Sequence, residues 1–457
     1  MRSGLDRFVG LVCRFLLGIF FRRIEVVGRD RLPAAGPYVV VANHVNGLID
    51  PMFVLGPLGV PARMLGKSTL WKIPVLRSLL DLAGAVPVHR PTDRGVDPSK
   101  NAETFARCHQ ELARGGRLAL FPEGVSHDDP HLKPLKTGIA RIVIEAERRH
   151  GPLAVAIVPV GLVFEERTRF RSRALVVIGE PLDPAPEVEL AASDEAGAVR
   201  ALTARVAAAL ERVTLNYDSW EEARLIELGA DVWDRDRSDL PRQRRLAAEF
   251  LLRRALADGL ERLQLEHPAE VAAAVGAARE YERLLSTAGV TDEQVAARWR
   301  LRPALSLASL TFARLLLASP VAALGTALNL VPWALVDLVS RFVRHEPNQI
   351  ATYKVFPALV LFPAAWIVEG FVVARFLGTG AGVAAGLLAL PAGWVALRWH
   401  ERRATLWAGT RAFLLLAGRR PVALELRARR ILVEEEVDRL FERWRALQPD
   451  GGAGIRA

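Results

Sequence analysis

The strongest structural signal in the chain lies in residues 38–51, which read Tyr38-Val39-Val40-Val41-Ala42-Asn43-His44-Val45-Asn46-Gly47-Leu48-Ile49-Asp50-Pro51. The first four residues form a short run of β-branched and aromatic side chains, which is typical of a buried strand. A polar loop follows this run and carries one histidine and one aspartate. The stretch therefore predicts a buried strand that ends in a loop with chemically reactive side chains.

Similar apolar runs bounded by glycine or proline occur further along the chain, at Leu118–Phe121, Val155–Val160 and Leu175–Ile178. Between these runs lie segments with helical periodicity, such as Ala102–Ala113 and Thr137–Arg149. An alternation of strands and helices is the pattern of an α/β layer structure. We therefore predict an α/β domain over residues 24–185.

His44 and Asp50 are close enough in sequence to interact if a helix or turn begins at residues 47–50. The Asp50 carboxylate can then contact one ring nitrogen of His44, fix its tautomer and leave the other nitrogen free to accept a proton. Neither Ser nor Cys adjoins the pair, so the arrangement suits a general base that activates a hydroxyl of the substrate. The alternative is an ordinary hydrogen bond between two surface residues.

Charged residues also follow the other predicted strands. Glu123 comes directly after a strand, and Arg90 ends an apolar run. Lys133 and Lys136 precede a helix start, which is a favourable place for an anion. Because ligand sites of α/β sheets lie beyond the carboxyl ends of strands, these groups predict a phosphate-bearing alcohol as substrate. Alternatively, Arg90 and Lys136 are solvated cations, and Glu123 caps a loop or pairs with an arginine.

Four blocks of the chain resemble, in order and spacing, the glycerolipid acyltransferases, which include lysophosphatidate and glycerol-3-phosphate acyltransferases. The blocks are Asn43-His44 with Asp50, Gly84–Arg90, Phe121-Pro122-Glu123-Gly124 and Val158-Pro159-Val160-Gly161, and the segment Lys67–Pro74 is also similar. The resemblance covers residues 25–185. It implies the fold of that family, a mixed sheet flanked by helices.

The resemblance also implies a role for each matching residue. His44 is the base that deprotonates the acceptor hydroxyl, which then attacks an acyl thioester, and Asp50 orients His44. Arg90 binds the acceptor phosphate, while Glu123 and Gly124 shape the acceptor site. The co-substrate is acyl-CoA or acyl carrier protein loaded with a fatty acid, and no metal or organic cofactor is implied.

Two departures from the family pattern indicate one subgroup of the family. Five residues separate His44 from Asp50 where the family usually has four, so an extra residue must fit near Gly47. The family usually continues its third block with Thr-Arg, whereas residues 125–128 are Val-Ser-His-Asp. Lys136, or His127 if protonated, then takes the place of the missing arginine. Both departures resemble a subgroup of glycerol-3-phosphate/dihydroxyacetone-phosphate acyltransferases with a C-terminal membrane hairpin.

The function implied is transfer of a fatty acyl group from acyl-CoA or acyl carrier protein to glycerol-3-phosphate or dihydroxyacetone phosphate, in phosphatidic acid and phospholipid biosynthesis. Two alternatives stay open: a lysophosphatidate acyltransferase, and a non-catalytic membrane protein that binds lipids or acts as a scaffold. The sequence carries no signal for the oligomeric state.

A metal site is a competing interpretation of the third block, because His127, Asp128, Asp129 and His131 have the composition of metal ligands. Pro130 would break the helix that could align the two histidines. We therefore expect a polar loop near the substrate and no metal.

The N-terminal segment is apolar over residues 8–21, but Arg14 interrupts it and Arg22 and Arg23 follow. A signal peptide needs an uninterrupted apolar stretch, and a membrane span needs about 20 apolar residues. We therefore expect an amphipathic helix over residues 1–23 that lies in the membrane interface. The alternative is a buried helix of a soluble domain.

Residues 301–417 hold the other apolar segments and form the predicted membrane-associated region. Two apolar segments flank a glycine-rich turn at residues 378–380, and each is about the length that crosses a ~30 Å hydrocarbon core. They predict a membrane helical hairpin over residues 355–397. Glu369 keeps open the alternative of two buried helices in a soluble bundle, since a carboxylate within a membrane is costly.

The segment before the hairpin, residues 315–336, has no charge but contains Pro320 and Pro332. It is therefore either a broken or re-entrant segment or a further span. Basic residues flank the hairpin on both sides, at Arg341, Arg344, Lys354, Arg398, Arg402 and Arg403. Because cytoplasmic flanks favour Lys and Arg, we expect the cytoplasmic membrane, with the catalytic domain on its cytoplasmic face and membrane lipids as partners.

The composition of the 457 residues agrees with this division. A hydrophobic content of 51% excludes disorder for most of the chain. The net charge of +10 comes almost entirely from scattered arginines, with few lysines, so it does not predict a nucleic-acid partner. Residues 186–300 have helical periodicity and predict a soluble helical subdomain, while residues 418–457 predict a charged helix with a tail.

Overall fold

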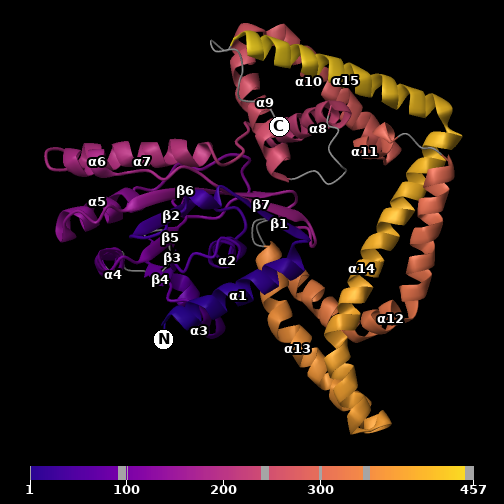
Figure 1. Cartoon of the computed structure of the whole chain (residues 1–457), viewed down its shortest axis with the longest axis horizontal. Helices are drawn as coiled ribbons and strands as arrows, with labels where there is room; N and C mark the ends of the chain where they lie inside the picture. The colour runs from indigo at the N-terminus through magenta and orange to yellow at the C-terminus, as the bar shows by residue number, and fades with distance from the viewer. Residues whose placement is uncertain are drawn as a thin grey trace. The chain divides into compact units, whose positions relative to one another are not determined.

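The structure is a computed structural model that describes residues 2–90, 99, 101–237, 246–297, 301–342 and 350–447 (Figure 1). These residues divide into two compact units. The first holds the described residues up to 220, together with 246–250 and 350–352. The second holds the described residues of 221–237, 251–342 and 353–447. The predicted tail and Arg344 lie outside the described residues.

The first unit is built on a sheet whose described strands follow the order β1-β7-β6-β2-β5-β3-β4. The strands are β1 (Arg23–Val27), β2 (Tyr38–Ala42), β3 (Arg63–Lys67), β4 (Val86–Val88), β5 (Arg117–Leu120), β6 (Ala156–Phe164) and β7 (Arg173–Ile178). Neighbouring strands are parallel except β6 and β7, which are antiparallel. The expected α/β fold with a mixed sheet is therefore confirmed.

Helices pack on this sheet because their apolar residues recur every three or four positions. In α5, Ile139, Ile142 and Val143 are buried in one core with the strands. Central strand β2 is buried along its whole length. The helices are α1 (Arg2–Phe20), α2 (Ile49–Leu55), α3 (Pro74–Leu82), α4 (Asn101–Ala113), α5 (Gly138–His150), α6 (Ala185–Leu190) and α7 (Glu195–Glu211), with short 3-10 turns at Arg29–Arg31 and Ser68–Lys72.

The first unit extends beyond the predicted boundary at residue 185. Leu202 and Leu210 of α7 belong to the same apolar core as the sheet. The chain after α7 also lies tight against β6, since a Cβ on Gly161 would stand 1.7 Å from the Val213 carbonyl oxygen. Residues 186–220 therefore belong to the sheet unit rather than to a separate helical subdomain.

The N-terminal helix α1 has two apolar faces. One face is buried within the first unit and includes Cys13, Leu17 and Phe20. The other face exposes apolar side chains at Leu5, Phe8, Leu11, Val12 and Phe15. A helix that anchors one face in protein and offers the other to solvent suits attachment to a membrane interface. The helix ends at Phe20, and β1 begins at Arg23, so the predicted segment 1–23 includes the first residue of the sheet.

The described residues of the second unit form helices. Buried Asp292 joins three of them by accepting hydrogen bonds of 2.9 Å from the Tyr281 hydroxyl, Arg235 Nε and Arg430 Nε. Burial and this carboxylate raise the pKa of the Tyr281 hydroxyl. The helices are α8 (Trp220–Arg237), α9 (Leu246–Glu266), α10 (Pro268–Ala288), α11 (Asp292–Ala296), α12 (Leu301–Phe342), α13 (Ile350–Leu377), α14 (Thr379–Gly418) and α15 (Arg420–Ala446), of which α8, α9 and α13 begin in the first unit.

Three described helices, α12, α13 and α14, are long and apolar enough to cross a membrane. α12 continues through Pro320 and Pro332, so the segment at 315–336 is one unbroken helix and not a broken or re-entrant one. α13 and α14 meet at Gly378, which has a φ of +90°. Protein buries only 22%, 6% and 22% of the apolar windows of the three helices. Surface this apolar needs a lipid cover, which indicates a membrane location and disfavours a soluble bundle.

Small and polar residues hold α12, α13 and α14 together. A Cβ on Gly325 of α12 would stand 2.0 Å from the Ala392 carbonyl oxygen of α14. Asn329 Nδ2 donates to the Ala389 carbonyl oxygen at 3.0 Å, and Trp366 Nε1 of α13 donates to Asn329 Oδ1 at 3.1 Å. Close approach at small residues and hydrogen bonds between helices are the usual means of association in lipid.

This packing predicts that Gly325→Ala destabilises the protein, because the new methyl group forces α12 and α14 apart. The matched control is Gly409→Ala in α14, where no other described residue approaches the Cβ position. Helix propensity alone makes Gly→Ala stabilising by about 0.5–1 kcal/mol, so the control should not lose stability. Thermal unfolding of the full chain in detergent measures both variants. Equal melting temperatures would contradict the close approach at Gly325.

Candidate active site

The loop after β2 lies near the middle of the sheet edge, because β2 stands between β6 and β5. Asn43 links this strand end to β6. Its Nδ2 donates to the Leu162 carbonyl oxygen at 3.0 Å, and its Oδ1 accepts the Leu162 N–H at 2.7 Å. His44 therefore follows a rigid, buried strand end, and its ring stacks on Phe121 with 4.2 Å between the ring centres.

His44 and Asp50 are in direct contact. Asp50 lies in the first turn of α2 and is fully buried, with Oδ2 at 2.9 Å from His44 Nδ1. The same oxygen accepts the N–H groups of Val45 and Asn46, each at 2.8 Å. Since a carboxylate only accepts, this contact places the ring proton on Nδ1 and leaves His44 Nε2 as an acceptor. The arrangement can therefore take a proton from a hydroxyl placed beside Nε2.

The longer spacing between the two residues is accommodated at Gly47. Gly47 has a φ of +49°, in the region that favours glycine. The Ile49 N–H donates to the Asn46 carbonyl oxygen at 3.0 Å and closes a tight turn around Gly47. This turn brings Asp50 back toward His44 despite the additional residue.

Glu123 joins the first and third blocks. It is buried, and its Oε1 accepts the His44 N–H at 2.7 Å. Its Oε2 accepts the Lys133 N–H at 2.8 Å and contacts His127 Nε2. Both carboxylate oxygens are thus engaged by the protein. Glu123 holds the backbone of His44 in place. Its effect on a ligand is therefore indirect, through the position of His44.

His127 does not occupy the place expected for a phosphate-binding cation. Its side chain is buried, and Nδ1 accepts the Asp129 N–H at 3.1 Å. Nε2 contacts Glu123, so the protein engages both ring nitrogens. These contacts favour Lys136 over His127 as the expected replacement for the missing arginine. Both nitrogens are also unavailable to a metal ion, and no cluster of potential ligands occurs among the described residues.

Gly124 and Lys136 lie side by side near the start of α5. Gly124 has a φ of +77°, and a Cβ there would stand 3.3 Å from Lys136 Cγ. The Lys136 N–H donates to the Pro122 carbonyl oxygen at 2.7 Å, and its side chain is exposed. Lys133 instead pairs with Asp129 at 3.0 Å, and this hydrogen bond lowers the pKa of the Asp129 carboxyl. Of the two lysines, Lys136 is the one placed to reach an anion.

Arg90 follows β4, at the same edge of the sheet as His44. β2, β5, β3 and β4 are parallel neighbours, so their carboxyl ends face one side. Three strand spacings separate β4 from β2, which is about 14 Å. The Asn101 side chain holds the backbone beside Arg90 through both the N–H and the carbonyl oxygen of His89, at 2.9 and 2.6 Å. Arg90 is half-buried at this edge of the sheet, away from His44 and Asp50.

The connection between β6 and β7 contributes an arginine that the sequence did not reveal. Arg167 pairs with Asp128 and donates to the His127 carbonyl oxygen at 3.4 Å. Its guanidinium lies 5.1 Å from the centre of the Trp220 ring. Arg167 lies in a turn that is far in sequence from the third block. The sequence pointed to it only indirectly, because the third block lacks the arginine that the family usually has. Asn43 was visible as part of the first block, but its link to β6 was not.

Comparison with known proteins identifies the kind of domain that holds His44 and Asp50. Residues 23–163 match the Acyltransferase family, and this range runs from β1 into β6. Residues 23–163 are thus similar to the Acyltransferase family. The match includes His44, Asp50, Arg90 and Glu123, and it confirms the family relationship that the sequence blocks predict.

Several relatives share the acyltransferase domain. An uncharacterized acyltransferase of Schizosaccharomyces pombe is 35% identical over 47% of this chain and 45% of its own length. Glycerol-3-phosphate O-acyltransferase 2 of Saccharomyces cerevisiae is 43% identical over 18% of this chain and 11% of its own. The chloroplastic 1-acyl-sn-glycerol-3-phosphate acyltransferase LPAT1 of Arabidopsis thaliana is 28% identical over 31% and 36%. The chain thus covers less than half the length of each.

The contacts of Glu123 predict that Glu123→Gln weakens the acyltransferase domain. An amide nitrogen cannot accept the N–H groups that face the carboxylate, and an unsatisfied buried donor costs about 1–3 kcal/mol. We expect a lower thermal unfolding temperature for Glu123→Gln than for Glu211→Gln, a control at an exposed glutamate at the end of α7. If both variants melted together, Glu123 would not be a bridge between the two blocks.

Proposed function

We propose that the chain is a membrane-bound O-acyltransferase that moves a fatty acyl group from acyl-CoA or acyl carrier protein to a hydroxyl of glycerol-3-phosphate or dihydroxyacetone phosphate. The product would feed phosphatidic acid and phospholipid biosynthesis. The observation that carries the proposal is the contact of 2.9 Å between His44 Nδ1 and Asp50 Oδ2 at the end of β2. It gives the acyltransferase domain an oriented base.

In the proposed reaction, His44 Nε2 takes the proton of the acceptor hydroxyl as its oxygen attacks the thioester carbon. The C–O bond forms, the C–S bond breaks, and the departing thiolate receives the proton from His44. Asp50 holds the ring and stabilises the imidazolium that forms between the two steps. No acyl-enzyme is required, because no Ser or Cys adjoins His44.

Arg90 and Lys136 are the proposed partners of the acceptor phosphate. Both are cations at the sheet edge that also presents His44, and clamping the phosphate would place the hydroxyl beside the base. The N–H groups of His44, Val45 and Asn46 already donate to carboxylates. The donors that stabilise the oxyanion must therefore come from elsewhere in the site. We propose no metal and no organic cofactor.

Two observations favour a small acceptor over lysophosphatidate. The spacing at Gly47 and the residues after Gly124 both follow the pattern of the subgroup that resembles this chain, and the glycerol-3-phosphate O-acyltransferase of yeast is 43% identical over 82 residues. The chloroplastic 1-acyl-sn-glycerol-3-phosphate acyltransferase, at 28% over 144 residues, supports lysophosphatidate as the second candidate.

The proposed location is the cytoplasmic membrane, with the acyltransferase domain on the cytoplasmic face. Lys354 before the hairpin and Arg398, Arg402 and Arg403 after its apolar part support this orientation, because cytoplasmic flanks favour basic residues. The exposed apolar face of α1 is a second proposed membrane attachment. Membrane lipids and the acyl thioester donor are then the partners of the chain.

The proposed roles of His44 and Asp50 are tested by incorporation of a labelled acyl chain into glycerol-3-phosphate. His44→Ala should abolish measurable transfer, whereas Asp50→Asn should slow turnover by 100-fold or more, on the order of the loss when a base loses its orienting partner, with acceptor KM unchanged. His150→Ala, at the exposed end of α5, is the control. Equal incorporation by His44→Ala and wild type would contradict the catalytic proposal.

The acceptor is tested by supplying glycerol-3-phosphate, dihydroxyacetone phosphate and lysophosphatidate side by side. We expect kcat/KM for at least one of the two small acceptors to exceed that for lysophosphatidate by tenfold or more, roughly the discrimination worth 1.4 kcal/mol. The same assay with acyl-CoA and with acyl carrier protein identifies the donor. A preference for lysophosphatidate would replace the first proposal by the second.

A further inference from the structure

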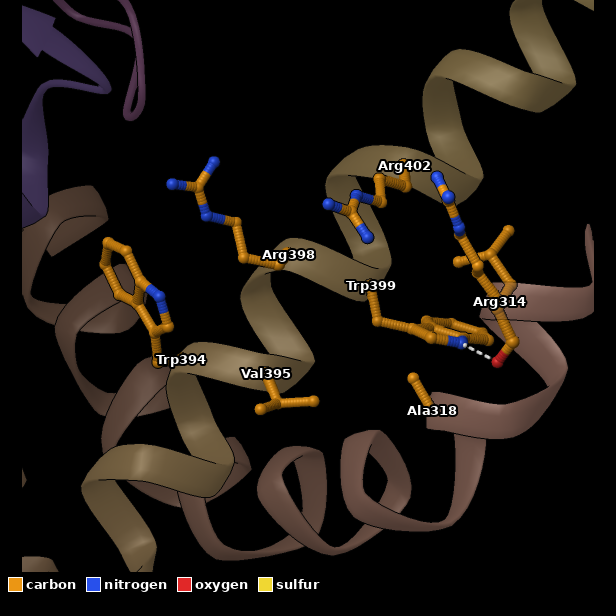
Figure 2. Close-up of a pocket in the computed structure, with 8 residues that line it drawn as sticks. Arg314, Ala318, Trp394, Val395, Arg398, Trp399 and Arg402 are labelled. Carbon is orange, nitrogen blue, oxygen red and sulfur yellow. Dashed lines mark hydrogen bonds between the residues drawn. The ribbon is translucent and has the colours of Figure 1, made fainter. Parts of the chain in front are cut away.

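The pair of apolar helices α12 and α14 borders an open cavity of about 260 Å³ within the second unit. Three arginines line it, Arg314 from α12 and Arg398 and Arg402 from α14 (Figure 2). Figure 2 shows the three side chains extending to the same side of the helix pair, above a floor that includes Ala318 and Val395. The cavity is thus apolar at its base and cationic at its mouth.

Arg314 directly precedes residues 315–336 of α12, which carry no charge. It shares the cavity with Arg398 and Arg402, which are one turn apart on α14. Three exposed guanidinium groups around one apolar cavity attract an anion.

The described residues supply little of that negative charge. Glu401 lies 3.6 Å from Arg398, and both side chains are partly exposed. Neither Arg314 nor Arg402 has an ion pair within the described part of the chain. The cavity therefore has room for an external anion and at least two guanidinium groups to bind it. Guanidinium groups match the oxygens of a phosphate in a bidentate fashion.

Two tryptophans frame the site. Trp399 Nε1 donates to the Leu315 carbonyl oxygen at 2.8 Å, which joins α14 to α12 beside the cavity (Figure 2). The Arg398 guanidinium lies 5.1 Å from the centre of the Trp394 ring, and Arg403 lies 5.1 Å from that of Trp399. Tryptophan is enriched at the level of lipid headgroups, so these rings place the cavity at a membrane interface.

The surface next to the cavity is apolar. Leu316, Leu317 and Val321 of α12 and Leu387 and Leu390 of α14 are exposed. A soluble phosphate would use only the cationic mouth, whereas a lipid would use both the cations and the apolar helix faces. We propose that this cavity binds the phosphate headgroup of an anionic phospholipid, with the acyl chains along α12 and α14. The site is separate from the acyltransferase domain and does not depend on the proposed reaction.

The test measures binding of dioleoyl phosphatidylglycerol to the purified full chain in a neutral detergent by native mass spectrometry. The double variant Arg314→Gln/Arg402→Gln should bind it at least tenfold more weakly, since it removes two of the three charged donors that face the phosphate. The control Arg411→Gln/Arg427→Gln removes the same charge at exposed positions outside the cavity and should change affinity less than twofold.

Two further arms separate the lipid from other occupants. Dioleoyl phosphatidylcholine should bind at least tenfold more weakly than phosphatidylglycerol, and millimolar inorganic phosphate should not displace the bound lipid. Arg402→Lys keeps the charge but loses bidentate contacts, so a several-fold loss of affinity is expected even if the double variant fails to fold. Equal binding by the cavity and control variants, equal binding of phosphatidylcholine, or displacement by inorganic phosphate would overturn the proposal. The His44→Ala protein should bind the lipid as wild type does.

Discussion

Two buried carboxylates hold the loop that follows β2, and the candidate site depends on them. Asp50 accepts the N–H groups of Val45 and Asn46 beside its contact with His44. Glu123 accepts the His44 N–H. A buried carboxylate is costly unless several donors surround it. The loop and the two carboxylates therefore determine one another's positions, and a ring nitrogen of His44 is left to act on a ligand.

The order of the strands converts these contacts into a site. Four parallel strands present His44, Glu123 and Arg90 at one edge. The antiparallel pairing of β6 with β7 turns the chain back at this edge and brings Arg167 to the third block. Parallel pairing gathers residues that follow strands, while the single antiparallel pair adds a residue that no strand-end motif contains.

Much of the fold was predictable because its central strands are continuous apolar runs. β2, β5, β6 and β7 have this pattern, whereas β1 reads Arg-Ile-Glu-Val-Val and β3 reads Arg-Met-Leu-Gly-Lys. These two strands form because they pair with β7, β4 and β5, and not because of their own residues. The prolines in α12 left two alternatives open, a broken segment and a further span, and the helix is unbroken. Contacts with α14, such as that of Gly325 with Ala392, help to stabilise an unbroken helix around them.

The sequence by itself determined the α/β class, the apolar segments and the contact of His44 with Asp50. Each of these depends on residues close together in the chain, where spacing and periodicity limit the geometry. The tertiary structure alone decided that Glu123 holds His44, that Arg167 reaches the third block, and that Arg314 shares a cavity with Arg398 and Arg402. These contacts join residues distant in sequence. They follow from strand order and helix packing, which no local pattern specifies.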